Sequence, residues 1–198
     1  MTSTATLHAV EDDPVDRARA MSAVADLLIA LGYDVADEHL ADTPRRVVDA
    51  LIDMTTSHPF VMTTFPNDER YDQPVVVRGI RFTSLCEHHL LPFRGEVDVA
   101  YLPGTRLVGL SKLARVVERH ARRLQVQERM TVQIADDLEE ALDPRGVAVV
   151  VRAEHLCMSI RGVRTPGAET RTAAVRGAFQ NDPELRFALR TETSGRMP

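Results

Sequence analysis

The chain has 198 residues, a net charge of −5 and a pI of about 5.8, with 44% hydrophobic and 27% charged residues. This composition is typical of one good-sized globular domain, and the acidic balance argues against a general nucleic-acid-binding protein. The first twenty residues lack the apolar stretch of a secretory signal, and no apolar run approaches the roughly 18 residues of a membrane helix. We therefore expect a cytoplasmic protein that binds neither nucleic acid nor membrane.

The N-terminal part is predicted to be helical. Apolar residues recur every three or four positions between Val15 and Leu31. A second helix is predicted in "ADTPRRVVDALIDM", with Thr43 as N-cap and Pro44 in the first turn. Residues 57–73 hold prolines and aspartates without periodicity, which indicates a long connection. The predicted organisation is a disordered tail at 1–13, a helical region and connection at 14–73, a catalytic domain at 74–191 and a C-terminal tail at 192–198.

Strand and helix patterns alternate in the second part of the chain. "QPVVVRGIRFTSL" is rich in β-branched residues, which predicts a strand. "FRGEVDVAYLP" alternates apolar and polar residues, which predicts a strand with one solvent-exposed face. "GLSKLARVVERHARRL" predicts a helix that Ser111 could cap, with Leu124 on its apolar face. "QERMTVQIADDLEEAL" predicts another helix.

Two further strands are predicted after these helices. The run "VAVVV" indicates a strand buried on both faces, a second extended segment covers residues 168–179, and "DPELRFALR" indicates a short closing helix. The order strand–strand–helix–helix–strand–strand is of the α+β class. Four strands cannot close a barrel, so we expect the antiparallel sheet to continue into neighbouring subunits.

The turn "SLCEHHLLPF" concentrates potential metal ligands. Cys86 and His89 are separated by two residues, a spacing that lets both side chains reach one ion from a single turn. His88 lies between Cys86 and His89 in the chain, and spacing alone does not decide which of the two histidines is the ligand.

The second cysteine also has a histidine close to it. Cys157 follows the long apolar strand, and His155 precedes it by two residues. On a strand, residues two apart point to the same side, so both would face one cavity while Leu156 would point into the core. In a reducing compartment the two cysteines are not expected to form a disulfide, which favours metal binding or nucleophilic chemistry.

Two thiolates and one imidazole are ligands that suit zinc. Three protein ligands leave a fourth position for water, which is typical of a catalytic zinc site, and such a zinc lowers the pKa of its water toward about 7. Histidines that do not bind the metal could act as general acid or base. The alternative is two buried thiols beside unrelated histidines, because C-x-x-H alone is a weak motif. That both cysteines lie in histidine-containing motifs favours zinc.

Several charged residues predict an anionic substrate. Lys112 and Arg115 lie about one helical turn apart after Ser111, at an expected helix start where phosphate binds favourably. Arg161 follows the second cysteine in "RGVR". Solvated surface charge is the alternative for each of these cations. Glu128, in "QVQERM", could equally be a favourable acidic residue of a first helical turn.

The blocks "CEHHLLPF", "GLSKLARVV", "RRLQVQERMTVQIAD" and "EHLCMSIRGV" closely resemble the zinc-dependent type of GTP cyclohydrolase I. The resemblance extends from about Leu27 to Leu189. It implies N-terminal helices followed by a tunnelling-fold domain of ββααββ type, in a toroidal homodecamer with active sites between subunits. It also implies hydrolysis of GTP to 7,8-dihydroneopterin triphosphate and formate, the first step toward tetrahydrofolate.

The resemblance implies roles for particular residues. The zinc ligands correspond to Cys86, His89 and Cys157, and the acid–base histidines to His88 and His155. His155 would protonate the purine N7, and His88 would assist later steps at the ribose.

The remaining matched positions would bind the substrate. Glu128 matches a carboxylate that binds guanine. Guanine offers N1–H and N2–H₂ as adjacent hydrogen-bond donors, whereas adenine lacks that donor pair. Gln127 matches a substrate-contacting position. The positions matched to triphosphate binding are Ser111, Lys112, Arg115 and Arg161, and Arg46 would reach the phosphates of a neighbouring subunit.

Two segments depart from the family's usual wording, residues 57–73 and "RTPGAETRTAAVRGAF". Neither contains an expected ligand or base. Related enzymes with other chemistry fit less well, since a nitrile-reducing relative needs a nucleophilic cysteine and a nicotinamide, and a pterin synthase needs three histidines on zinc. A non-catalytic binding protein would need neither the acid–base histidines nor Glu128. The sequence leaves open whether a regulatory partner binds.

Overall fold

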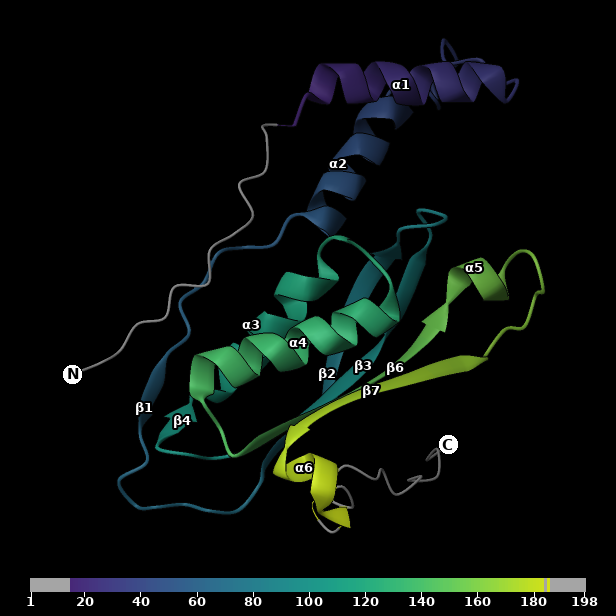
Figure 1. Ribbon diagram of the computed structural model, residues 1–198. Coiled ribbons are helices and arrows are strands. Elements are labelled where there is room, and N and C mark those ends of the chain that lie inside the picture. The colour runs from purple at the N-terminus through teal and green to yellow at the C-terminus, as the bar shows by residue number, and fades with distance from the viewer. Residues whose placement is uncertain (1–14, 184, 186–198) are drawn as a thin grey trace, which may run out of the picture.

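A computed structural model describes residues 15–183 and 185 of the chain. Two N-terminal helices, α1 (Arg17–Ala30) and α2 (Thr43–Thr55), precede a sheet that carries two long helices (Figure 1). The other elements are β1 (Thr64–Pro66), β2 (Val75–Cys86), β3 (Pro92–Leu102), β4 (Arg106–Val108), α3 (Leu110–Ala121), β5 (Leu124–Gln125), α4 (Gln127–Leu142), β6 (Gly146–His155), α5 (Leu156–Ser159), β7 (Glu169–Gly177) and α6 (Ala178–Asn181).

The predicted α+β class is confirmed, as is the order of the long elements, two strands, two helices and two strands. The tails expected at 1–13 and 192–198, and most of the expected closing helix, lie outside the described residues. Among the residues that are described, no helix has the length and apolar character needed to cross a membrane.

The main sheet has five strands in the order β5-β2-β3-β6-β7. The long strands pair antiparallel, and the short β5 pairs in parallel with the end of β2. The register sets Phe93 opposite His155, and Cys86 opposite Gln125. The end of β2, the start of β3, the end of β6 and the start of α4 therefore meet at one end of the sheet, where α5 also lies (Figure 1).

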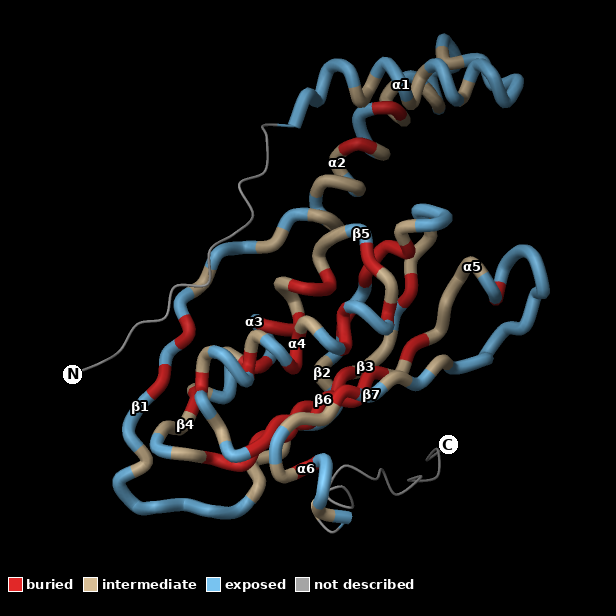
Figure 2. The backbone as a smooth tube through the Cα atoms, viewed as in Figure 1, coloured by how far each residue is buried: buried red, intermediate tan, exposed pale blue. Residues whose placement is uncertain are grey.

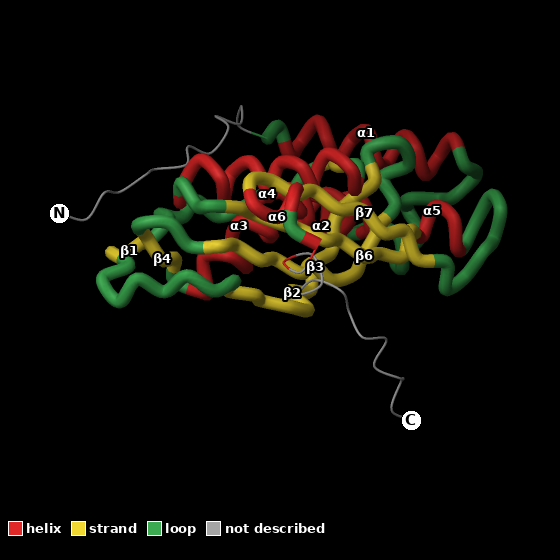
Figure 3. Tube along the Cα trace, turned by 60° about the horizontal axis from the view of Figure 1, so that its bottom comes forward, coloured by secondary structure: helices red, strands yellow, loops and turns green. Residues whose placement is uncertain are grey.

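The main core lies between the sheet and the helices α3 and α4, which cover the same face (Figures 1 and 3). Each helix contributes a stripe of apolar residues at spacings of three and four, as predicted. The strand β6 is buried on both faces, which confirms that prediction (Figure 2). Val147, Val149 and Val151 face the main core, whereas Ala148 and Val150 join a smaller cluster under α6.

The prediction of one solvent-exposed face for β3 is wrong in its second half. Ala100 and Leu102 pack with Phe179 in the smaller cluster, so they are buried together with the residues that face the main core. The pattern misled because Asp98 also points to this face, and its polarity suggested contact with solvent.

Two predicted details of the helices are also wrong. Gly109, not Ser111, is the N-cap of α3, and Ser111 is its second residue and exposed. Leu124 belongs to β5 instead of continuing the apolar face of α3, and 43% of its surface is exposed. In α2 the N-cap is Asp42, one residue before the predicted Thr43, and Pro44 lies buried in the first turn.

The connection at 57–73 is more ordered than its composition predicts. It contains β1, which pairs antiparallel with β4 immediately before α3. Met62 is buried in the main core. In contrast, α1 has no buried side chain and packs against α2, away from the sheet (Figure 1).

A buried ion pair fixes the irregularity in β2. Asp98 is 1% exposed, and its carboxylate accepts one hydrogen bond from the Arg152 guanidinium at 2.9 Å and another from the Gly79 N–H at 2.9 Å. Gly79 has a φ of 68°, and the pairing of β2 with β3 shifts between Val77 and Ile80. Asp98 therefore joins β2, β3 and β6 through one carboxylate.

Replacing Asp98 by alanine should lower the free energy of unfolding by about 3 kcal/mol, because it leaves the Arg152 charge without its buried partner. Glu96 is the matched control, since it lies two residues away on β3 and faces exposed Arg81 at 3.8 Å. Glu96→Ala should cost less than about 1 kcal/mol. Equal losses for the two variants in denaturant unfolding would contradict the role given to the buried pair.

Candidate metal centre and active site

Three potential metal ligands converge at the end of the sheet. Cys86 ends β2, His89 lies in the following turn and Cys157 lies in α5, and their ligand atoms are all within 4.8 Å of one another. The Cys86 Sγ is 3.8 Å from the His89 Nδ1. Ligand atoms on one tetrahedral zinc lie roughly 3.5 to 3.8 Å apart. The donor set therefore suits zinc, and the distance between the Cys86 and His89 ligand atoms matches such a site.

Backbone hydrogen bonds shape the turn that carries two of these ligands. The Cys86 N–H donates to the Leu91 carbonyl at 2.9 Å, and the Cys86 carbonyl accepts from the Leu90 N–H at 2.9 Å. Leu90 has a φ of 52°, in the left-handed region that closes such turns. The turn therefore returns the chain into β3 and leaves the histidines on its outside.

The argument that placed Cys157 on a strand is wrong. The strand β6 ends at His155, and the helical turn α5 begins at the next residue, because the chain leaves the sheet there. Leu156 is half-buried and does not point into the core as predicted. Cys157 still reaches Cys86, but through the turn of α5 and not through alternation along a strand.

The geometry distinguishes the two adjacent histidines. Their Nδ1 atoms are each 3.8 Å from the Cys86 Sγ, so distance to this sulfur does not separate them. A ring nitrogen of His89 also lies within 4.8 Å of the Cys157 Sγ, so His89, and not His88, completes the group of three converging ligands. His88 is exposed beside the group, with its ring centre 6.3 Å from that of His89.

His155 lies next to this group with its ring plane fixed. The ring stacks on Phe93 with a centroid distance of 4.7 Å and an interplanar angle of 1°. Its Nε2 is 2.8 Å from the Gln127 Oε1. Burial lowers the pKa of His155, and the carboxylate of Glu128 partly opposes this by favouring the charged form. Glu128 is exposed at the start of α4, so its oxygens are accessible beside His155.

Electrostatic effects on Cys157 place one more expected residue near the group. Burial raises the pKa of the Cys157 thiol, and the neighbouring Cys86 raises it further. The Arg161 guanidinium has the opposite effect and stabilises the thiolate. Arg161 is exposed and therefore available to an anion that approaches the site.

Other expected substrate-binding residues lie elsewhere in the chain. Ser111, Lys112 and Arg115 occupy the N-terminal part of α3, whereas the C-terminal end of this helix leads into β5 beside Cys86. At about 1.5 Å per residue, the two ends of α3 lie roughly 15 Å apart. Ser111 and Lys112 therefore lie nearly a helix length from the end of α3 that leads to Cys86, and Arg115 lies about half that length from it. Arg46 is exposed on α2 and pairs with Asp42 at 3.1 Å.

Two residues of the site were missed by the sequence reasoning. Phe93 supports His155, and its only signal was its place at the start of a strand that begins beside the cysteine turn. Glu154 accepts hydrogen bonds from the Ser159 hydroxyl at 2.7 Å and the Gly167 N–H at 3.1 Å. These bonds lower the pKa of Glu154 and close the loop that carries Cys157.

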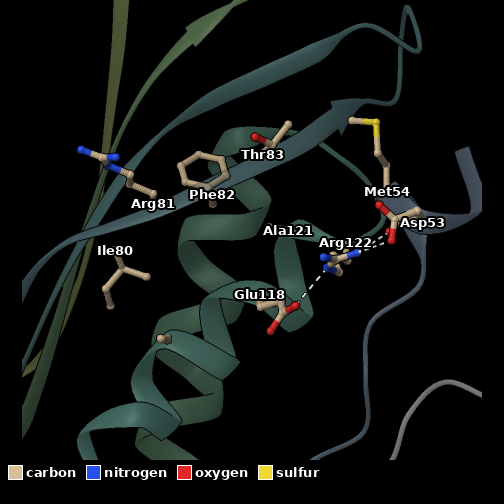
Figure 4. Close-up of a pocket in the computed structure, with 10 residues that line it drawn as sticks. Asp53, Met54, Ile80, Arg81, Phe82, Thr83, Glu118, Ala121 and Arg122 are labelled. Atoms are coloured by element: carbon tan, nitrogen blue, oxygen red, sulfur yellow. Dashed lines mark hydrogen bonds and ion pairs between the residues drawn. The ribbon is translucent and has the colours of Figure 1, made fainter. Parts of the chain in front are cut away.

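A cavity of about 470 Å³ lies away from this group, between the end of α2, the strand β2 and the helix α3 (Figure 4). Arg122 lines it and joins Glu118 of α3, at 3.0 Å, to Asp53 of α2, at 3.2 Å. None of the expected site residues lines the cavity. The cavity follows the outer edge of β2, on the side away from β3. Among the described residues, no strand pairs with this edge before Leu85.

Comparison with known proteins agrees with the geometry. The model of the family GTP cyclohydrolase I matches residues 20–193. The chain belongs to the GTP cyclohydrolase I family. It is 52% identical over 178 residues to "GTP cyclohydrolase 1" of Mycolicibacterium vanbaalenii, covering 86% of this chain and 87% of the relative. It is 51% identical over 171 residues to the enzyme of that name from Streptomyces coelicolor, covering 84% and 85%.

A third relative is similar over most of its length. The protein of that name from Rhodopirellula baltica is 50% identical over 175 residues, covering 87% of this chain and 76% of the relative. The match includes both N-terminal helices except for the first turn of α1, as well as the whole sheet. The helices are therefore part of what the family shares, although α1 buries no side chain in one chain.

Cys157→Ala should abolish stoichiometric zinc binding, because two ligands cannot replace the three that converge here. His88→Ala should retain the metal, since His88 lies outside the three-residue group. Metal content per chain, measured by atomic emission after dialysis, tests both. Loss of zinc from His88→Ala together with retention in His89→Ala would reverse the assignment of the histidine ligand.

Proposed function

We propose that the protein converts GTP and water to 7,8-dihydroneopterin triphosphate and formate in a zinc-dependent reaction, the first step of tetrahydrofolate biosynthesis. The observation that carries the proposal is the convergence of Cys86, His89 and Cys157 next to His155, in a chain of this family. A structural zinc site would need no adjacent histidine with a ring fixed by stacking and hydrogen bonding.

The metal ligands in this proposal are Cys86, His89 and Cys157. They would hold a zinc ion, which when bound would supply Lewis-acid activation of a water for opening the imidazole ring of the purine. His155 holds the proton for the purine N7, and the lowered pKa of this histidine makes the proton easy to release. His88, exposed in the same turn, is proposed to transfer protons in the later steps at the ribose.

Glu128 is proposed to select guanine. Its carboxylate is exposed at the first turn of α4 and close enough to His155 to affect the pKa of that ring. A carboxylate can accept hydrogen bonds from N1–H and N2–H₂ of guanine together. Adenine offers no such pair of donors, so ATP would leave the carboxylate partly unpaired in the site and bind weakly.

The triphosphate is proposed to bind between two copies of the chain. Arg161 lies near the metal group of its own chain, as its effect on Cys157 indicates. Ser111 and Lys112 lie in the first turn of α3 and Arg115 near its middle, and all three are at least partly accessible. Their use in the same reaction requires the N-terminus of α3 from a neighbouring subunit, and Arg46 on the projecting α2 is suited to reach another copy in the same way.

Assembly through the sheet edges supports this arrangement. In the described part of the chain, residues 75–84 of β2 have no strand on their outer side, and β7 forms the opposite edge. Exposed edges of this length favour pairing with another strand. A neighbour's β7 beside β2 would extend the antiparallel sheet into a ring, and we propose that a toroidal homodecamer results.

Incubation of the zinc-loaded protein with GTP should release one formate per GTP and give a product that becomes fluorescent neopterin after oxidation and dephosphorylation. ATP should release no formate under the same conditions. Both products are measured in parallel, formate enzymatically and neopterin by chromatography. The proposal would be falsified if fully zinc-loaded protein gave neither product from GTP.

Mixing two inactive variants tests whether the site is shared between subunits. Cys157→Ala removes a metal ligand and Lys112→Ala removes a phosphate-binding cation, so each homo-oligomer should be nearly inactive. After joint unfolding and reassembly, some interfaces combine an intact metal group with an intact α3 N-terminus, and activity should return to a substantial fraction. Mixing without subunit exchange is the control, and absence of recovery in verified hetero-oligomers would contradict a shared site.

A further inference from the structure

The Gln127 side chain is buried and fully engaged with groups of its own chain. Gln127 is the first residue of α4 and 1% exposed. Its Nε2 lies 3.2 Å from the Val151 carbonyl oxygen and 3.0 Å from the Thr170 carbonyl oxygen, and its Oε1 lies 2.8 Å from the His155 Nε2. Such a side chain has no exposed polar atom for GTP, so the substrate-contacting role expected from the resemblance does not suit it.

The neighbouring groups determine which way the amide points. Carbonyl oxygens only accept hydrogen bonds, so the atom that faces Val151 and Thr170 must be the NH₂ group. A hydroxyl also faces this group, since the Thr172 Oγ1 lies 3.1 Å from the Gln127 Nε2. If this hydroxyl accepts a hydrogen bond from the amide NH₂, all three contacts of the Gln127 Nε2 are consistent with the same orientation of the amide.

The protons of two threonines show that Thr172 does accept. The Thr131 hydroxyl donates to the Gln127 backbone carbonyl at 2.7 Å, which uses its only proton. The contact of 2.6 Å between the Thr131 and Thr172 hydroxyls must therefore use the Thr172 proton. Thr172 then has only lone pairs to offer to the Gln127 amide. Donors run in one direction through the network, from Gln127 to Thr172 to Thr131 and back to the Gln127 backbone.

The same orientation fixes the protonation of His155. The Gln127 Oε1 can only accept, so the His155 Nε2 must carry a hydrogen, and in the neutral ring the lone pair is then on Nδ1. Stacking on Phe93 prevents the ring from turning out of this plane. We infer that Gln127 is a positioning residue that holds His155 in the Nε2–H tautomer and thereby makes Nδ1 the nitrogen that exchanges a proton with the substrate.

This inference gives a balanced proton transfer. The charged His155 ring carries hydrogens on both nitrogens. When it gives its Nδ1 proton to the purine N7, it becomes the neutral Nε2–H tautomer that the Gln127 oxygen stabilises. The identity of the proton acceptor rests on the proposed function, whereas the tautomer is a property of the protein alone.

The tautomer can be measured directly in the assembled wild-type protein. Magic-angle-spinning spectra of histidine-¹⁵N-labelled protein separate protonated from unprotonated ring nitrogens, and the signals of His155 are those lost in His155→Asn. We expect protonated Nε2 and unprotonated Nδ1 in the neutral ring. A wild-type spectrum with hydrogen on Nδ1 instead would overturn the inference, even if no Gln127 variant folds.

Gln127→Met keeps the size of the side chain and removes the acceptor. The His155 spectrum should then show a mixture of tautomers, and kcat for formate release should fall about 10- to 100-fold, as for other residues that orient a functional histidine. The KM for GTP should change less than about threefold, because Gln127 does not contact the substrate. An unchanged tautomer, or a raised KM with unchanged kcat, would refute the positioning role.

Gln125→Met is the matched control for general damage to the fold. Gln125 is also completely buried, two residues earlier, and its amide bonds to the His120 carbonyl and to Gln133 but not to His155. The Gln125→Met variant should have a lower free energy of unfolding but the same His155 tautomer as the wild type. A changed tautomer in this variant would count against a specific effect of Gln127. If wild-type protein releases no formate from GTP, the proposed function fails while the tautomer measurement still stands.

Discussion

The antiparallel pairing of β3 with β6 is the constraint on which the site depends. It sets Phe93 directly opposite His155, and the pairing of β3 with β2 brings Cys86 to the same end of the sheet. Because side chains alternate along a strand, a slip of one residue would turn His155 away from Phe93 and move every valine of β6 to the wrong face. The two apolar clusters on the faces of β6 prevent this slip, so the core that stabilises the sheet also aligns the histidine.

Polar groups add a second level of constraint inside this apolar frame. Asp98 joins three strands, and the Gln127 amide joins α4 to β6 and β7. A buried polar group costs free energy when a partner is missing, so each group tolerates only the arrangement that satisfies all its bonds. Apolar packing alone would accept small shifts between α4 and the sheet. The amide does not, and α4 therefore presents Glu128 to the site at a fixed place.

Sequence periodicity predicted most of the fold because each long element has a single apolar pattern. The stripes of α3 and α4 and the run "VAVVV" belong to elements whose local preference agrees with their tertiary position. The predictions failed where tertiary contacts override local pattern. Asp98 looks exposed because its partners Gly79 and Arg152 are distant in sequence, and the composition of 57–73 hid a strand whose partner β4 follows 40 residues later.

The three expected metal ligands do converge, but the strand alternation that was expected to bring Cys157 there is wrong. Alternation along a strand was expected to set Cys157 on the same side as His155, yet the chain leaves the sheet at His155 and a helical turn brings the thiol to Cys86 and His89. From the sequence, only the resemblance to the family indicated that His89, and not His88, is the metal ligand. No local pattern could reveal the stacking of Phe93 on His155, because it depends on the register between strands more than 60 residues apart.

The site of one chain is chemically unbalanced, and this imbalance points to assembly. Its described residues offer potential metal ligands, a fixed histidine and a carboxylate suited to the guanine base. A triphosphate, however, carries several negative charges, and only Arg161 among the expected cations lies near the group. Lys112 lies in the first turn of α3, where the dipole adds to its charge, but nearly a helix length from the C-terminal end of α3, and Arg115 lies near the middle of the helix. Moving α3 within the chain would expose its buried stripe, Leu113, Val116 and Val117. In the proposed oligomer a second copy would supply the missing charge without that cost, so assembly would complete the site where conformational change within one chain cannot.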